Sequence, residues 1–199
     1  MFNSKKKTLF NGFAVSILTT LCFNIIIVSF HLIHVENLSF FIHMTLPCII
    51  SMIVIPFFVE KKIFKTITPS INQILRQLFI FGLTFIPFSI FYFLKYSSKF
   101  DNIDILVNLI THYLVVACGE EYIYRHIIFK IVKANYNDWL AIIFSSVLFA
   151  FIAHLNEPII DNLYYRLPMG IFLCIVAKFL KGIGLSVSLH AIYNLMVII

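Results

Sequence analysis

Long apolar runs follow one another along this chain, and short polar segments separate them. A helix needs about 20 mostly apolar residues to cross the hydrocarbon core of a membrane. By that measure the sequence predicts seven spans: Thr8–Leu32, Leu38–Val59, Leu78–Leu94, Ile103–Ile131, Trp139–Leu155, Leu167–Leu180 and Ile183–Ile199. The longest polar connection, Glu60–Gln77, has only 18 residues, so no soluble domain is expected.

The composition supports the same class of protein. Of the 199 residues, 61% are hydrophobic and only 12% are charged, and the mean hydropathy is +0.97. A soluble domain carries about 25% charged residues, so these charges cannot cover a soluble globule. We therefore predict an all-α, polytopic membrane helix bundle that crosses the cell membrane several times. The richness in Phe, Ile and Lys points to a bacterial cytoplasmic membrane.

The net charge of +6 indicates membrane lipid rather than nucleic acid as the partner, because the basic residues gather at the ends of the spans. If the N-terminus is inside, the outer segments hold only Lys95, Lys99 and Arg166. The inner segments hold all the others: Lys5, Lys6, Lys7, Lys61, Lys62, Lys65, Arg76, Arg125, Lys130, Lys133, Lys178 and Lys181. This asymmetry predicts an inside N-terminus.

Ionisable residues inside the apolar runs gather in the second half of the chain. Such residues are costly in a membrane and mark a candidate functional site. We therefore divide the single membrane domain into an N-terminal three-span region, residues 1–100, and a core that holds this candidate site, residues 101–199.

The fourth predicted span contains two adjacent carboxylates and an arginine. On a helix, Glu121 and Arg125 are one turn apart and can form an ion pair. Glu120 points about 100° away and is free to face a cavity. An alternative is that the helix ends near Gly119 and that these charges lie at the inner interface.

Two further spans contribute polar side chains, His154 on the fifth and His190 with Asn194 on the seventh. His190 and Asn194 share a helix face, which also suits a simple helix–helix hydrogen bond. A carboxylate with a histidine can activate water, and a second histidine with an amide can stabilise an oxyanion. Glu120, His154 and His190 could instead hold zinc, because two histidines and a carboxylate are a zinc ligand set.

The order of these motifs resembles the CPBP family of CAAX proteases and bacteriocin-processing enzymes, also called the ABI family. The first motif, EExxxR, runs from Glu120 to Arg125, and the third, HxxxN, runs from His190 to Asn194. The second motif departs from the family pattern FxxxH, because His154 follows Phe149 by five residues here. On an α-helix the extra residue turns the phenylalanine by about 100° relative to the histidine.

The resemblance implies an intramembrane endopeptidase with no metal cofactor. Glu120 would activate water with the help of His154, and Glu121 and Arg125 would order the site. His190 and Asn194 would stabilise the oxyanion. The expected substrate is a membrane-associated peptide or protein, either lipidated or a bacteriocin or leader peptide. The alternative is a non-proteolytic membrane protein of the same family that acts in bacteriocin self-immunity or as a scaffold.

If the helices were straight and upright, the three motifs would lie at different depths in the membrane. His190 is near the inner edge, Glu120 is near the middle and His154 is in the outer half of its span. Helix tilt is therefore required before these side chains can meet.

Overall fold

A computed structural model describes residues 2–32, 41–63, 70–100 and 102–197, and every element in these ranges is helical. The α-helices join short π-helical and 3-10 segments, labelled η, into seven continuous helical segments. In chain order they are α1 (Phe2–Leu32); η1 (Phe41–Thr45), α2 (Leu46–Cys48), η2 (Ile49–Val54) and α3 (Ile55–Ile63); α4 (Ile71–Tyr96) and η3 (Ser97–Lys99); α5 (Ile103–Glu121), η4 (Tyr122–Ile128) and α6 (Phe129–Lys133); α7 (Asp138–Leu148) and η5 (Phe149–Ala153); α8 (Ile159–Asp161), η6 (Asn162–Arg166) and α9 (Leu167–Phe179); and α10 (Gly184–Val197).

Five of these segments are long and apolar enough to cross a membrane: Lys6–Ser29, Phe41–Glu60, Ile71–Lys99, Ile103–Lys133 and Ile159–Phe179. Two shorter apolar helices, Asp138–Ala153 and Gly184–Val197, take the places of the fifth and seventh predicted spans. The predicted helical bundle is thus confirmed. The predicted start at Leu38 and end at Ile199 lie outside the described residues, and the inside N-terminus stays a prediction.

Helix α1 begins at Phe2, six residues before the predicted Thr8, and two later helices also begin earlier than hydropathy predicts. The third predicted span starts at Leu78, but α4 starts at Ile71 because Ser70 and Gln73 form a reciprocal capping box at its N-terminus. The sixth predicted span starts at Leu167, whereas its helix starts directly after Pro158. Both early starts consist of helical turns that carry polar side chains, which a hydropathy criterion leaves out.

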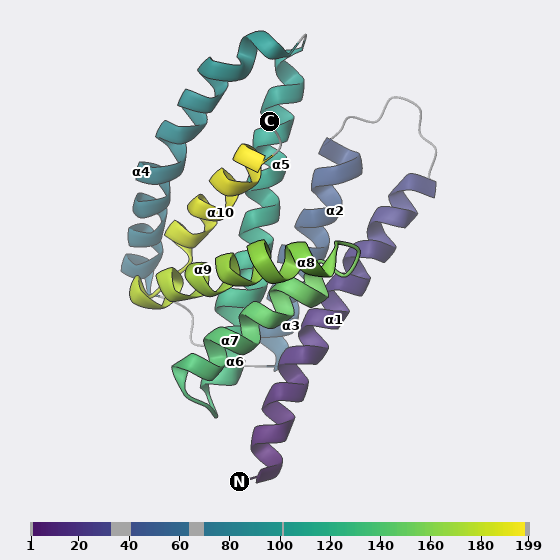
Figure 1. The fold of residues 1–199 in the computed structure, drawn as a ribbon, viewed down its shortest axis with the longest axis vertical. Coiled ribbons are helices and arrows are strands. Elements are labelled where there is room, and N and C mark those ends of the chain that lie inside the picture. The colour runs from purple at the N-terminus through teal and green to yellow at the C-terminus, as the bar shows by residue number, and fades with distance from the viewer. Residues whose placement is uncertain (1, 33–40, 64–69, 101, 198–199) are drawn as a thin grey trace.

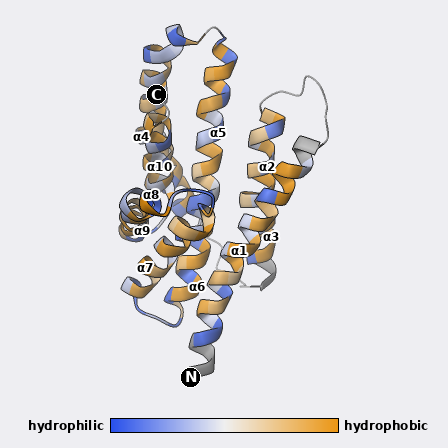
Figure 2. Cartoon of the chain, turned by 45° about the vertical axis from the view of Figure 1, so that its right-hand side comes forward, coloured by the Kyte–Doolittle hydropathy of each residue, from blue (hydrophilic) through white to orange (hydrophobic). Residues whose placement is uncertain are grey.

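The helices form two groups that are joined by crossing segments (Figure 1). The antiparallel helices α4 and α5 pack against α10, while α1 lies beside the segment from α2 to α3. Helix α7 is tilted, and α9 lies across the long axis of the bundle in both ribbon views (Figures 1 and 2). Because of this inclination, the fifth and sixth helical segments pack against η4, the segment that continues α5.

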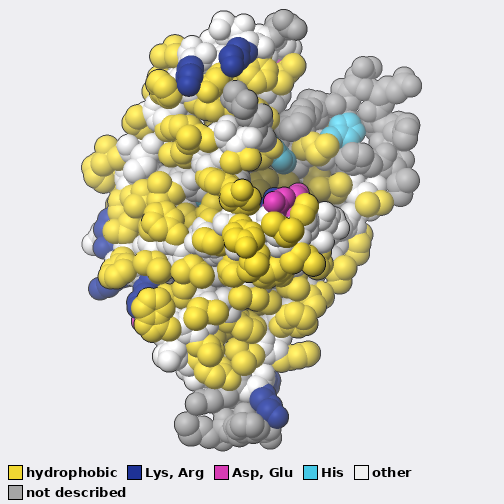
Figure 3. Space-filling model, viewed as in Figure 1, with side chains coloured by type: hydrophobic (Ala, Val, Ile, Leu, Met, Phe, Trp, Pro, Cys, Tyr) yellow, Lys and Arg dark blue, Asp and Glu magenta, His cyan; other side chains and the backbone are white. Residues whose placement is uncertain are grey.

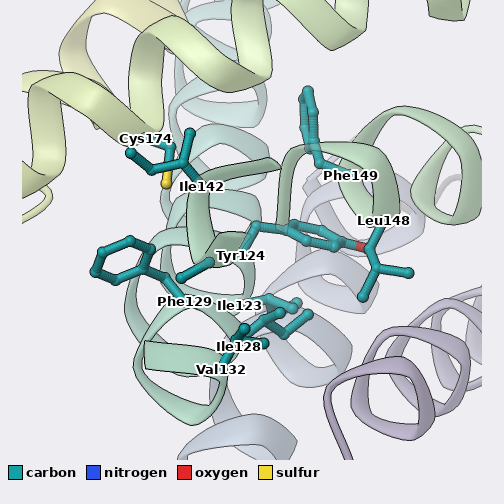
Figure 4. Packing of buried hydrophobic residues seen from close by; sticks show 10 residues of the cluster. Ile123, Tyr124, Ile128, Phe129, Val132, Ile142, Leu148, Phe149 and Cys174 are labelled. Carbon is teal, nitrogen blue, oxygen red and sulfur yellow. The ribbon is translucent and has the colours of Figure 1, made fainter. Parts of the chain in front are cut away.

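Apolar side chains form both the core and most of the outer surface. One buried cluster surrounds Tyr124 and Phe149 (Figure 4), and another surrounds Tyr92 between α4, α5 and α10. The outward faces of the long helices are also hydrophobic (Figures 2 and 3), with Leu94 and Phe179 among the most exposed side chains. Such a surface suits lipid rather than water, and the protein is a multi-pass membrane protein.

The first turns of α4 hold the turn between α9 and α10. Arg76 Nη2 and Gln77 Nε2 donate to the Leu180 carbonyl at 2.7 and 3.1 Å, and Gln77 Oε1 accepts from the Gly184 N–H at 2.9 Å. A β-carbon on Gly184 would overlap the carbonyl oxygen of Gln77. Because α10 starts at this contact and carries His190, the glycine helps to set the position of the histidine.

We expect Gly184→Ala to lower the melting temperature (Tm) of the purified protein, because the backbone oxygen of Gln77 cannot rotate out of the way. The matched control is Gly82→Ala within α4, where the nearest atom lies 3.7 Å from an added β-carbon. Alanine is favoured over glycine in a helix by about 0.8–1.0 kcal/mol, so the control should keep or raise the Tm. Thermal unfolding in detergent measures both. An unchanged Tm for Gly184→Ala would contradict the close contact between α4 and α10.

Candidate active site

The two glutamates sit where α5 passes into the π-helical segment η4. The helix does not end at Gly119, so the carboxylates lie inside a continuous helical segment rather than at its end. Both residues are buried, with Glu120 5% and Glu121 0% exposed. A carboxylate at such a position requires polar partners.

Glu121 finds its partners on its own helix and on α10. Arg125 Nη1 lies 3.2 Å from Glu121 Oε1, and neither side chain is exposed. The same oxygen lies 2.9 Å from His190 Nδ1. Arg125 is held further by the Gly170 carbonyl, 3.4 Å from Nη2. Glu121 is therefore the centre of a buried network that joins η4, α9 and α10.

Glu120 points to two imidazole rings. Its Oε2 lies 3.3 Å from His190 Nε2, and its Oε1 lies 3.7 Å from His154 Nε2. His190 thus bridges the two glutamates through its two ring nitrogens. His154 is the most open of the three, with 23% of its side chain exposed. The tilted helices therefore bring together three residues that upright helices would hold at different depths.

The Phe149 ring packs against the rings of His154 and His190, although its spacing from His154 is one residue longer than in the family pattern. The centre of its ring lies 5.2 Å from that of His154 and 5.6 Å from that of His190. The Arg125 guanidinium carbon lies 4.2 Å from the ring centre, a cation–π contact. The expected rotation of Phe149 away from His154 is therefore wrong. Segment η5 is π-helical, and a π-turn closes over one more residue than an α-turn.

The sequence comparison agrees with this geometry. Residues 102–196 match the profile of a family described as type II CAAX prenyl endopeptidase Rce1-like. We call these residues the Rce1-like domain, after the profile that they match. The match confirms the resemblance to the CPBP family and extends over α5 to α10, while residues 1–101 lie outside it. The comparison finds no matching curated protein and no matching solved structure.

Asn194 stands apart from the other polar residues of the Rce1-like domain. It lies one turn after His190 on α10 and is half-buried. Within the described ranges, no hydrogen bond or ion pair links its amide to Glu120, Glu121, His154 or His190. Its role as an oxyanion donor rests on the motif and stays a prediction.

The backbone of His154 is held by residues that sequence reasoning did not single out. Asn162 is 2% exposed, and its Nδ2 donates to the His154 carbonyl at 3.0 Å. Arg166 in turn donates to Asn162 Oδ1 at 3.1 Å and lies 3.4 Å from Glu157. The only available signal was the spacing of four between Asn162 and Arg166 on η6, which is too common to indicate a site.

The N-terminal region also supports the first motif from outside the Rce1-like domain. Glu60 on α3 accepts a short hydrogen bond from the Tyr122 hydroxyl and lies 3.2 Å from His126 Nε2. Ser16 on α1 shares a hydrogen bond of 3.0 Å with the buried Tyr124 hydroxyl. Both contacts fix η4, the segment that directly follows the two glutamates.

Glu120, His154 and His190 also form the alternative zinc ligand set. Across residues 2–32, 41–63, 70–100 and 102–197, no three His, Cys, Asp or Glu side chains are arranged to hold a metal ion. Glu120, His154 and His190 are instead arranged as a carboxylate between two imidazoles. This arrangement suits proton transfer at the carboxylate.

Proposed function

We propose that the protein is an intramembrane endopeptidase that hydrolyses a peptide bond with a water molecule activated by Glu120 and His154. The observation that carries the proposal is the position of Glu120, whose carboxylate lies between two imidazoles inside a domain of a protease family. A buried carboxylate next to a histidine is a pair that can take a proton from water.

The distance between Glu120 and His154 suits a shared water. At 3.7 Å the two side chains are too far apart for a direct hydrogen bond, and one water can contact both. Glu120 takes a proton from this water, and the water oxygen forms a bond to the carbonyl carbon of the substrate. The carbon–nitrogen bond then breaks, and the proton passes from Glu120 to the leaving amine.

The remaining polar residues hold this pair in place and receive the developing charge. The Glu121–Arg125 ion pair fixes His190, and His190 fixes Glu120. The proposed donors to the oxyanion are the amide of Asn194 and the Nε2–H of His190, which turns from Glu120 to the oxyanion once Glu120 has taken the proton from the water. A preorganised donor of this kind contributes about 10²–10³-fold to the rate.

We propose that the substrates are membrane-associated peptides or proteins, either lipidated or of the bacteriocin or leader-peptide class. To test this, the purified protein is incubated with prenylated and unprenylated membrane peptides in ¹⁸O-labelled water. Hydrolysis incorporates one ¹⁸O atom into the new carboxyl terminus, which mass spectrometry detects. If a folded preparation cleaves none of these peptides, the non-proteolytic immunity or scaffold function replaces this proposal.

The metal-free mechanism makes a separate prediction about zinc. We expect a fully active preparation to contain well under one zinc per chain, and 1,10-phenanthroline to inhibit it little, because Glu120 and His154 activate water directly. Elemental analysis and activity with and without the chelator measure this. Stoichiometric zinc that is lost together with activity in His190→Ala would establish Glu120, His154 and His190 as zinc ligands instead.

A further inference from the structure

A cavity lies beside the proposed active site, among α4, α5, η4, α6, α9 and α10. Its volume is about 780 Å³, within the range of cavities that bind small molecules. Apolar side chains form much of its wall, among them Leu78, Phe81, Leu114 and Val187. Glu120, His154 and His190 do not line it, so the cavity is separate from the proposed water-activating pair.

Four lysines lie at one end of this cavity: Lys130, Lys133, Lys178 and Lys181. Asp138 pairs with two of them, at 3.0 Å from Lys133 Nζ and 2.8 Å from Lys178 Nζ. Lys181 forms no ion pair with any described residue. Lys130 forms none with a described carboxylate, but its Nζ lies 3.1 Å from His126 Nε2, and that nitrogen lies 3.2 Å from Glu60 Oε1. One aspartate therefore faces four lysines, and this end of the cavity keeps an excess of positive charge.

The position of the lysines indicates which molecules can reach them. They lie on α6, at the end of α9 and in the turn after it, a part of the chain that the distribution of basic residues predicts to be at the inner membrane surface. The lipids of that surface are partly anionic and attract lysine and arginine. An apolar cavity between membrane-spanning helices, with more lysines than carboxylates at its end, therefore matches a molecule with an acyl chain and an anionic headgroup.

We propose that this cavity binds one anionic phospholipid. Its acyl chain lies along the apolar wall between α4 and α10, and its phosphate headgroup lies at Lys130 and Lys181. A zwitterionic lipid lacks the net charge that the lysines require, and a free anion lacks the chain that the apolar wall requires. The proposal does not depend on peptide hydrolysis. Arg125 lines the cavity as well as pairing with Glu121, but Lys130, Lys181 and the apolar wall take no part in the proposed chemistry.

To test this, lipid is titrated into the purified full chain in detergent, and the Tm of the protein is measured at each lipid concentration. A ligand that binds only the folded state raises the Tm in a concentration-dependent way. We expect dioleoyl phosphatidylglycerol to raise the Tm and dioleoyl phosphatidylcholine to have little effect. Replacing Lys130 and Lys181 by glutamine should weaken phosphatidylglycerol binding roughly 30-fold, the effect of two lysines near an anionic headgroup.

The matched control replaces Lys95 and Lys99 by glutamine at the opposite end of α4, where these lysines lie near the Tyr96 ring. This variant loses the same charge and should keep the response. Equal responses to the two lipids, or equal weakening in both double variants, would overturn the proposal. A matching Tm rise with glycerol 3-phosphate would also overturn it, since an anion without a chain would then suffice.

A second measurement locates the acyl chain in the unmodified protein. Phosphatidylglycerol with a photoreactive diazirine at the end of its acyl chain should label the peptides of α4 and α10 that contain Phe81 and Val187. Ala177→Phe, which fills the cavity from α9, should abolish this labelling. Labelling confined to peptides outside the cavity would refute the assignment, whether or not Ala177→Phe folds.

Discussion

Replacing Glu120 by alanine is expected to lower the rate of peptide hydrolysis by about 10²–10⁴-fold, the usual effect of losing a general base. The variant should still reach the membrane, because Glu121 and Arg125 retain each other as partners. The rate is measured with purified protein and a peptide that the wild type cleaves. Glu120→Gln should be equally inactive, since the amide keeps the shape of the side chain but cannot accept the proton.

The matched control is Asp104→Ala, which removes an exposed carboxylate from the first turn of the same helix, α5. We expect this variant to keep the wild-type rate. Cleavage at the wild-type rate by Glu120→Ala would remove Glu120 from the mechanism. A comparable loss of activity in Asp104→Ala would mean that the effect comes from the helix and not from the general base.

Replacing Arg125 by alanine is expected to damage stability more than any other single change in the site. The variant leaves the carboxylate of Glu121 buried without its cation, which costs about 3–5 kcal/mol. It also removes the guanidinium from the Phe149 ring. For a chain of this length the loss corresponds to a Tm decrease of roughly 6–20 °C. Thermal unfolding in detergent and abundance in the membrane measure the effect.

The double variant Glu121→Gln, Arg125→Met separates charge from packing. It removes both charges, so we expect it to be more stable than Arg125→Ala although it lacks the ion pair. Normal stability of Arg125→Ala together with a selective loss of activity would contradict this role. Glu121 and Arg125 would then act in the chemistry, and the roles of the two glutamates would have to be exchanged.

The helical bundle could be predicted from the sequence because each long apolar run corresponds to a helix that can cross the membrane. In such a chain the polar exceptions are informative, and Glu120, Glu121, Arg125, His154 and His190 all lie within one connected group. The ion pair at a spacing of four requires only a continuous helix. Such predictions succeed when the contact lies within a single helix, or when the membrane alone determines which segments are apolar.

The supporting residues could not be predicted in the same way. Glu60 reaches Tyr122 and His126 only because the second helical segment packs on the fourth, and Asn162 reaches the His154 carbonyl only through a turn. Neither partner can be identified from spacing along the chain. Helix tilt is likewise set by packing, so the meeting of His154 with Glu120 required the three-dimensional structure.

The π-turn before His154 changes how an insertion in this motif should be understood. The wider π-turn absorbs the added residue and keeps the Phe149 ring against that of His154, so a spacing of four on an ordinary α-turn would give the same contact. Related chains that differ by a single residue here can therefore share the same pocket, even though a gap-free alignment would pair the wrong positions. A search for relatives should accordingly allow one variable position between Phe149 and His154.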